Sequence, residues 1–262
     1  MAESTDSSGT DNSGHWFETW FNHPLYLQVY SHRDQEEASQ CIRTVLSVSG
    51  LELKKPASLK VLDIACGAGR HALEFARLGY CVTGNDLSPF LLEEARKEAL
   101  NCNLQLELTC SDMRDIPAST HFDLVVQLFT SFGYFDMKED DRVVLRKVFD
   151  ALKSGGWYVL DLINPVHLAG NLVAETRRNA GNLTLIEERA FCEDKITKTI
   201  TVTPPDGPKL TFSESVRLYS REEIVALLQN EGFSVTGIVG NYQGDPFMEN
   251  DSPRMMIFCQ KP

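Results

Sequence analysis

The sequence has little basic clustering and no long apolar run. Lys and Arg occur together only in short pairs such as Lys54-Lys55 and Arg177-Arg178, and the formal net charge is -12. Proteins that follow a nucleic-acid backbone draw on clustered positive charge, so we expect no nucleic-acid partner and predict that these pairs are solvated surface. No stretch approaches the roughly 18–20 apolar residues that cross a bilayer, and we expect no membrane partner.

Cysteine offers no metal site and no disulfide framework. The seven cysteines are scattered and form no Cys-x-x-Cys pair, so we expect no bound metal. Reduced thiols in a cytoplasmic setting fit this pattern best. Residues 1–15 lack the basic and apolar regions of a secretory signal, and we expect them to form a flexible tail. The oligomeric state stays open.

Short apolar segments alternate with helical patterns along most of the chain. Strands are predicted at residues 59–65, 81–85, 104–109, 122–128, 157–162, 233–239 and 255–260. Helices are predicted between them, among others at residues 70–78, 140–152 and 221–230. This alternation implies parallel βαβ units covered on both faces. We therefore predict an α/β fold with a doubly wound, mostly parallel, seven-stranded Rossmann-like sheet.

Two regions fall outside this alternation. Residues 16–56 are rich in aromatic side chains and predict one or two helices, which we interpret as an N-terminal helical lid. Residues 166–218 predict antiparallel strands, and we interpret them as an insertion over the active site after the fifth strand. Its three predicted strands are residues 183–188, 195–202 and 210–218. Residues 57–165 and 219–262 would then form the cofactor-binding core.

The strongest chemical signal is the glycine turn that follows the first predicted strand. Gly67 and Gly69 come shortly after Asp63, and they lack the β-carbons that would keep the backbone away from a ligand. Asp86 falls at the end of the second strand, where a carboxylate can accept hydrogen bonds from both hydroxyls of a ribose. Open parallel sheets bind ligands at this edge, so we predict a nucleotide-like ligand.

The same turn also fits a dinucleotide. Gly67, Gly69 and Ala72 match the relaxed dehydrogenase fingerprint, so a nicotinamide-dependent oxidoreductase stays an alternative. Asp63 argues against it, because its carboxylate would attract an ammonium group but repel a pyrophosphate.

An ordered set of motifs resembles the class I S-adenosylmethionine-dependent methyltransferases. The set is Asp63-Ile-Ala-Cys-Gly-Ala-Gly-Arg70, Asp86, Ser111-Asp112-Met113, Asp123-Leu-Val-Val-Gln127 and Leu152-Lys-Ser-Gly-Gly156. The resemblance implies S-adenosylmethionine as cofactor and S-adenosylhomocysteine as product. It also implies that Asp63 holds the methionine part and Asp86 the ribose. Together with Asp63, the backbone of the turn would hold the methionine part; this backbone includes Ala65, Cys66, Gly67 and Gly69.

The resemblance assigns further cofactor-binding roles by position. Leu87 would pack on the adenine, and Asp112 would accept a hydrogen bond from the exocyclic amine, with Met113 beside it. Gln127 would line the pocket near the sulfonium.

Residues 26–33 suit a lid over this site. Tyr30 and Arg33 would close over the cofactor carboxylate, because Arg offers a bidentate donor pair. Residues 129–135, together with the inserted strands, resemble a subgroup of small-molecule methyltransferases in which extra antiparallel strands roof the active site.

Methyl transfer from a sulfonium is an in-line displacement that needs alignment and exclusion of water more than a catalytic side chain. A base is useful only if the acceptor must lose a proton, and the candidates are Tyr134, His167 and Tyr242. None is assigned. We predict a methyltransferase (EC 2.1.1.-) that acts on a small-molecule acceptor. The alternatives are the oxidoreductase and an S-adenosylmethionine-binding protein without catalysis.

Overall fold

A seven-stranded sheet forms the centre of the computed structural model, which describes residues 15–31, 35–116 and 121–262. The strand order is β10-β11-β5-β4-β1-β2-β3, and β11 alone runs antiparallel to its neighbours β5 and β10. The strands are β1 (Lys60–Ile64), β2 (Cys81–Asp86), β3 (Glu107–Cys110), β4 (Phe122–Gln127), β5 (Leu152–Ile163), β10 (Ser234–Val239) and β11 (Arg254–Gln260). The predicted fold class is confirmed.

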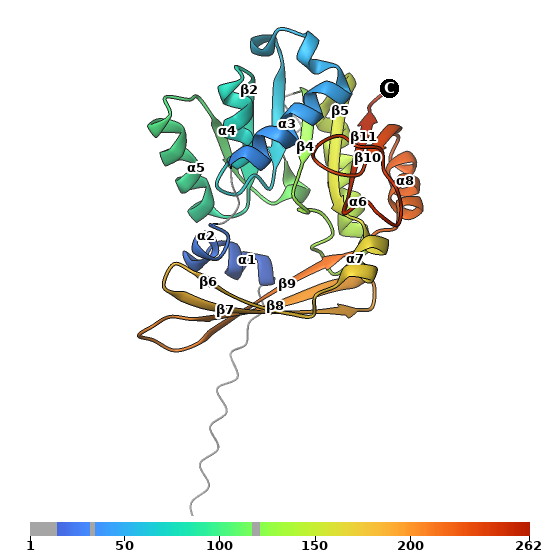
Figure 1. The fold of residues 1–262 in the computed structure, drawn as a ribbon. Helices are drawn as coiled ribbons and strands as arrows, with labels where there is room; N and C mark the ends of the chain where they lie inside the picture. Colours follow the sequence, from blue (N-terminus) through green and yellow to red (C-terminus); the bar gives the residue numbers. More distant parts are fainter. Residues whose placement is uncertain (1–14, 32–34, 117–120) are drawn as a thin grey trace, which may run out of the picture.

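Helices cover both faces of this sheet (Figure 1). Because side chains of a strand alternate between faces, Val125 of β4 joins one apolar cluster while Leu124 and Val126 join the other. The first cluster includes residues of α6 (Lys138–Ala151) and α8 (Arg221–Asn230), and the second includes residues of α3 (Gln35–Ser49) and α4 (Arg70–Arg77). Ser88 caps α5 (Pro89–Asn101) by accepting the N–H of Leu91, and a capping box of Ser220 and Glu223 starts α8.

A second, antiparallel sheet lies beneath the first (Figure 1). It has four strands rather than three, namely β6 (Glu175–Ala180), β7 (Leu183–Cys192), β8 (Lys195–Thr203) and β9 (Leu210–Arg217). The prediction missed β6 because five of its six residues are polar or charged. It also missed α7 (Pro165–Asn171), which the Asn164 side chain caps. Arg178 of β6 corrects a further expectation: it is not solvated surface but pairs with Glu187 at 2.9 Å.

Two short helices, α1 (Trp16–Phe21) and α2 (Leu25–Val29), lie between the two sheets (Figure 1). With α3 they make three α-helices where one or two were predicted. Trp20 of α1 is buried and packs against Phe212 of β9 with ring centroids 4.2 Å apart. The two helices therefore share an apolar cluster with the inserted sheet.

In the central sheet, the structure corrects the starts of two strands by more than one residue. β3 begins at Glu107, three residues later than predicted, and β5 begins at Leu152, five residues earlier. Gly155 and Gly156, which lie between the predicted helix 140–152 and the predicted strand 157–162, belong to β5 because the end of the chain pairs with them. The N–H of Gly155 donates to Lys261 O at 2.7 Å, and the N–H of Lys261 donates to Gly156 O at 3.0 Å.

Three short 3-10 helices complete the described elements: η1 (Leu51–Leu53), η2 (Pro56–Ser58) and η3 (Met113–Asp115). Among the described helices, none combines the length and the apolar character that a membrane crossing requires.

Candidate functional site

The turn after β1 places three residues in the left-handed region of the backbone. Ala65, Gly67 and Gly69 have φ angles of 53°, 56° and 82°. Gly69 is the N-cap of α4 and lies behind the turn, so it does not line the cavity described below. The N–H of Gly67 turns toward β2, where it meets the carboxylate of Asp86.

Asp86 is fixed at the end of β2 by two backbone donors. Its Oδ2 accepts the N–H of Gly67 at 2.7 Å, and its Oδ1 accepts the N–H of Ser88 at 2.8 Å. Burial raises the pKa of Asp86, against the effect of these two hydrogen bonds. Each carboxylate oxygen can accept a further hydrogen bond, and the side chain lines a cavity that a ligand could enter.

Asp63 is the most unusual titratable group of this site. Its side chain is buried, and within the described part of the chain its Oδ2 has no hydrogen-bond partner. Burial, and then the charge of Asp86, raise the pKa of Asp63 to about 8. A buried carboxylate of this kind gains most from a cationic partner.

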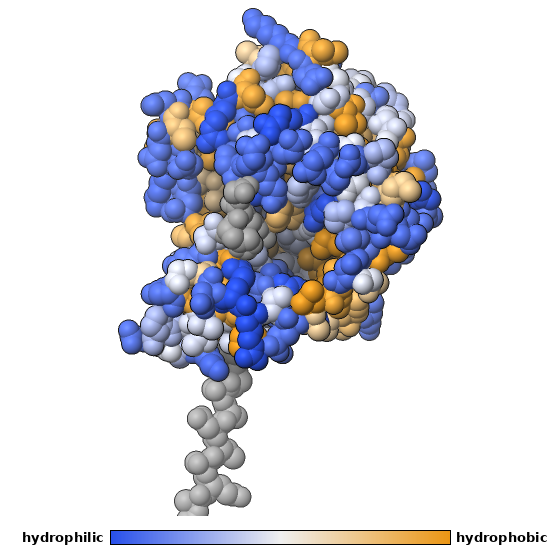
Figure 2. Space-filling view, in the orientation of Figure 1, coloured by the Kyte–Doolittle hydropathy of each residue, from blue (hydrophilic) through white to orange (hydrophobic). Residues whose placement is uncertain are grey.

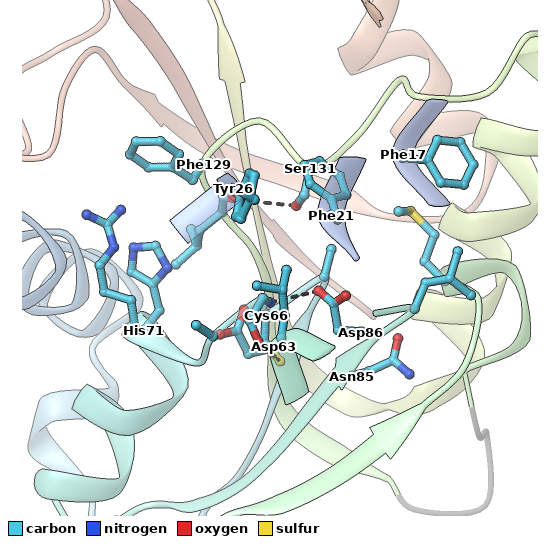
Figure 3. Close-up of a pocket in the computed structure, with 18 of the residues that line it drawn as sticks. Phe17, Phe21, Tyr26, Asp63, Cys66, His71, Asn85, Asp86, Phe129 and Ser131 are labelled. Atoms are coloured by element: carbon cyan, nitrogen blue, oxygen red, sulfur yellow. Dashed lines mark hydrogen bonds between the residues drawn. The ribbon is translucent and has the colours of Figure 1, made fainter. Parts of the chain in front are cut away.

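These residues line a cavity of about 340 Å³ at the carboxyl edge of the sheet. Figure 3 shows Asp63, Asp86 and Asn85 along one side of it, with the rings of Phe129, Tyr26 and Phe21 across from them. Most of the predicted cofactor-binding residues lie on its wall, namely Tyr30, Asp63, Ala65, Cys66, Gly67, Asp86, Leu87, Asp112 and Met113.

The structure corrects the position predicted for Gln127. This side chain is fully buried and does not lie on the cavity wall. Its Nε2 donates to Ser131 O at 2.8 Å, and its Oε1 accepts the hydroxyl of Tyr158 at 2.7 Å. Gln127 therefore holds the following loop from below. Arg33, the other member of the predicted lid pair, lies outside the described residues.

Asp112 and Asn85 form the end of the cavity beside β3. Both carboxylate oxygens of Asp112 accept hydrogen bonds from Arg114, at 2.7–3.0 Å, and although burial opposes it, Arg114 lowers the pKa of Asp112. Asn85 was not predicted. Its Nδ2 donates to the hydroxyl of Ser111 at 2.7 Å, while its buried Oδ1 has no partner among the described atoms.

A loop after β4 separates this cavity from a second one. Phe129 and Thr130 have φ angles of 62° and 64°, a conformation that costs energy for residues other than glycine. The carboxylate of Asp161 fixes the loop by accepting the N–H of Phe129 at 2.8 Å. Arg254 pairs with Asp161 at 2.7 Å and donates to the hydroxyl of Thr130 at 2.8 Å.

Two of the three base candidates lie away from both cavities. The hydroxyl of Tyr242 donates to Asp161 at 2.8 Å beneath the loop, and burial raises its pKa. His167 lies on α7, and its side chain is on neither cavity wall. Tyr134 lines both cavities.

The second cavity measures about 270 Å³ and lies between the loop and the inserted sheet. Its floor comes from β7, β8 and β9. It shares five aromatic residues with the first cavity, namely Phe21, Tyr26, Tyr30, Phe129 and Tyr134, which we call the aromatic border. Figure 2 shows that the surface is hollowed where the core and the inserted sheet meet.

Comparisons with known proteins agree with this geometry. Residues 61–156 match a family described as a methyltransferase domain. The dTDP-3-amino-3,4,6-trideoxy-alpha-D-glucopyranose N,N-dimethyltransferase of Streptomyces venezuelae is 31% identical over 73% of this chain and 82% of its own length. The cypemycin N-terminal methyltransferase of a Streptomyces species is 25% identical over 75% of this chain and 81% of its own length.

A solved structure resembles the whole fold. The S-adenosylmethionine-dependent methyltransferase from Clostridium acetobutylicum superposes with a TM-score of 0.76 and 21% identity, over 92% of this chain and 97% of that chain. At this level of identity the likeness concerns the fold.

Proposed function

This chain belongs to the class I S-adenosylmethionine-dependent methyltransferases, and from that premise we propose that it methylates an amine nitrogen of a small molecule. S-adenosylmethionine is its cofactor, and methyl transfer leaves S-adenosylhomocysteine. The proposal concerns the acceptor atom and the residues that bind each reactant.

The donor side of the proposal rests on the first cavity. The buried Oδ2 of Asp63 suits the ammonium of the methionine part, and Asp86 suits the ribose hydroxyls. Asn85 and Asp112 would face the adenine, with Leu87 and the side chain of Met113 packed beside it. Tyr30 would close the site from the N-terminal helices, residues 16–56, which we propose as the lid.

The aromatic border is the observation that carries the proposal. It joins the cavity at the glycine turn to the cavity whose floor is the inserted sheet, residues 166–218, so a donor and an acceptor can meet across it. When bound, the cofactor supplies an electrophilic methyl group. The border residues would align the two reactants and exclude water, and alignment of this kind is worth up to about 7–11 kcal/mol of the barrier.

The choice of nitrogen follows from the relatives. The Streptomyces venezuelae relative acts on an amino sugar nucleotide, and the cypemycin enzyme acts on an N-terminus. An amine acceptor must lose a proton, and Tyr134 is the base candidate that lies on the border.

The first experiment is a calorimetric titration of the full chain with S-adenosylmethionine, S-adenosylhomocysteine and NADPH. We expect both sulfur compounds to bind and NADPH not to bind. Asp86→Ala should weaken binding by at least about tenfold, since hydrogen bonds to a charged group contribute roughly 1.5–3 kcal/mol each. Asp123→Ala is the matched control, because Asp123 is the second residue of β4, at the amino end of the strand and away from the cavity, and pairs with Lys153.

The acceptor is then sought by incubating the protein with S-adenosylmethionine and a mixture of small amines and alcohols. Mass spectrometry should find methylated amines. Methylation of the alcohols alone would overturn the nitrogen proposal, and binding of NADPH alone would overturn the donor assignment.

A further inference from the structure

The floor of the second cavity is basic, although the protein as a whole is acidic. Arg189 of β7 and Lys198 of β8 line the cavity from the inserted sheet, and Arg254 lines it from the core. Glu214 of β9 is the one acidic residue among its lining residues. The formal net charge of the chain is -12, so this local concentration of cations indicates a cavity that attracts an anionic ligand.

The carboxylates of the inserted sheet do not balance these cations. Glu187 of β7 is buried and pairs with Arg178 at 2.9 Å, Arg189 at 2.6 Å and Lys198 at 3.7 Å. Although burial opposes it, Lys198, Arg178 and Arg189 lower the pKa of Glu187 to about 2, so it stays ionised. With Glu214, the inserted sheet has two carboxylates on this face against three cations, Arg178, Arg189 and Lys198. The charge of Arg254 is neutralised separately by Asp161 of the core.

Glu214 is already engaged by protein donors. Its Oε1 accepts hydrogen bonds from Trp20 Nε1 at 2.8 Å and from the hydroxyl of Tyr30 at 2.5 Å. Its Oε2 lies 3.6 Å from Lys198 Nζ. A cationic ligand would therefore meet a carboxylate whose charge Lys198 offsets, with Arg189 and Arg254 on the same cavity wall.

Arg189 retains capacity to bind an anion. Its bonds to Glu187 and to the hydroxyl of Thr176 use two of its five N–H groups, and its side chain is 23% exposed. The ion pair with Glu187 holds the guanidinium in place, so an anion would meet an oriented donor set. Partial burial strengthens such charge-assisted hydrogen bonds.

We propose that the second cavity selects an acceptor with an anionic group, a carboxylate or a phosphate, and binds this group at Arg189 and Lys198. The atom to be methylated then lies toward the aromatic border. This inference rests on the proposed function, because it assigns the acceptor to the second cavity. It narrows the acceptor to small amines that also carry negative charge.

The test measures binding of four probes to the full chain saturated with S-adenosylhomocysteine. Inorganic phosphate and O-phosphoethanolamine represent phosphate, glycine represents a carboxylate with an amine, and ethanolamine is an amine without an anion. We expect O-phosphoethanolamine or glycine to bind at least about tenfold more tightly than ethanolamine. Which of the two binds more tightly distinguishes phosphate from carboxylate recognition.

Three variants locate the anion. Arg189→Gln and Lys198→Gln should each weaken binding of the anionic probe by about tenfold and leave the affinity for S-adenosylhomocysteine unchanged. Arg189→Lys keeps the charge next to Glu187 and should retain most of the binding, even if Arg189→Gln folds poorly. Arg177→Gln is the matched control, because Arg177 is an exposed cation of the same sheet that pairs with Glu175.

Equal binding of ethanolamine and the anionic probes would overturn the inference, as would an equal loss in Arg177→Gln. Failure of the wild-type chain to bind S-adenosylhomocysteine would instead contradict the donor assignment. In that case preference for anionic probes in the absence of S-adenosylhomocysteine, lost in Arg189→Gln, would still support the basic floor.

Discussion

Asp161 Oδ2 accepts a hydrogen bond of 2.8 Å from the backbone N–H of Phe129, a residue held at a φ of 62°. A buried side chain on β5 thus fixes the backbone of the loop that divides the two cavities. Arg254 of β11 and Tyr242 bind the same carboxylate. The position of the Phe129 ring, and with it the aromatic border, therefore depends on a charged group that touches neither cavity.

Asp161→Asn should destabilise the protein by about 3–5 kcal/mol, the usual effect of removing one partner of a buried ion pair. Arg254 would keep its charge without the carboxylate that neutralises it, and Phe129 would be less firmly held. Urea unfolding gives the free energy. Where the variant stays folded, we expect a larger loss in kcat than in affinity for S-adenosylhomocysteine. Unchanged stability and kcat would show that the loop holds its conformation without Asp161.

Asp63 should make the stability of the protein without cofactor fall as the pH rises. Its pKa is about 8 in the folded protein and about 3.8 in the unfolded chain, so the folded state binds more protons between these values. The stabilisation is complete below pH ~4, decreases by up to about 1.4 kcal/mol per pH unit, and is lost near pH ~8. Urea unfolding from pH 5 to 8 measures this slope.

The comparison variant for this slope is Asp63→Asn, which has no proton to lose. Its free energy of unfolding should change less with pH than that of the wild type. Parallel slopes in the two proteins would assign the pH dependence to other groups.

Cofactor affinity should have the opposite dependence on pH. An ammonium group needs an ionised Asp63, so binding releases a proton from this carboxyl below pH 8. The affinity for S-adenosylhomocysteine should rise by up to about tenfold per pH unit between pH 6 and 8. Calorimetry in buffers of different ionisation enthalpy counts the released proton. A pH-independent affinity with no proton release would mean that Asp63 does not meet the ammonium.

Gly67→Ala should weaken cofactor binding at least tenfold and cost about 1–2 kcal/mol of stability, because an alanine at a φ of 56° is strained and adds a β-carbon to a residue that lines the cavity. Gly155→Ala is the control. Gly155 lies on β5, away from the cavity, and it has a φ of 75° with open space around its position. It should lose similar stability and keep full affinity. Equal affinity in the two variants would remove the glycine turn from the binding site.

The core of the fold and the glycine turn were predictable because both depend on local order along the chain. The apolar sequence of strands such as β4 predicts their burial, and Asp86 is the last residue of its own strand, β2. β6 carries no such pattern. It is held by pairing with β7 and by the Arg178–Glu187 contact, which are visible only once the strands are assembled.

The site was predicted less completely where a side chain could point in two directions. Gln127 and Asp86 each end a strand, but the Gln127 side chain donates to Ser131 O of the loop after β4 and accepts the hydroxyl of Tyr158 from β5. Asn85 was missed because its partners are Thr109 of the neighbouring strand β3 and Ser111, which follows that strand. The basic floor joins three strands and the core, so no single stretch of sequence contains it.

The strand order has a consequence for how the protein is made. β11 enters between β5 and β10, although it follows both of them in the chain, and its residues 255–259 are fully buried there. During synthesis, β10 leaves the ribosome before β11, the strand that hydrogen-bonds it to the rest of the sheet. The same strand brings Arg254 to Asp161, so the loop that divides the two cavities gains this contact only after β11 has joined the sheet. A nascent chain that stops before residue 254 would therefore expose the edge of β5 to chaperones and proteases.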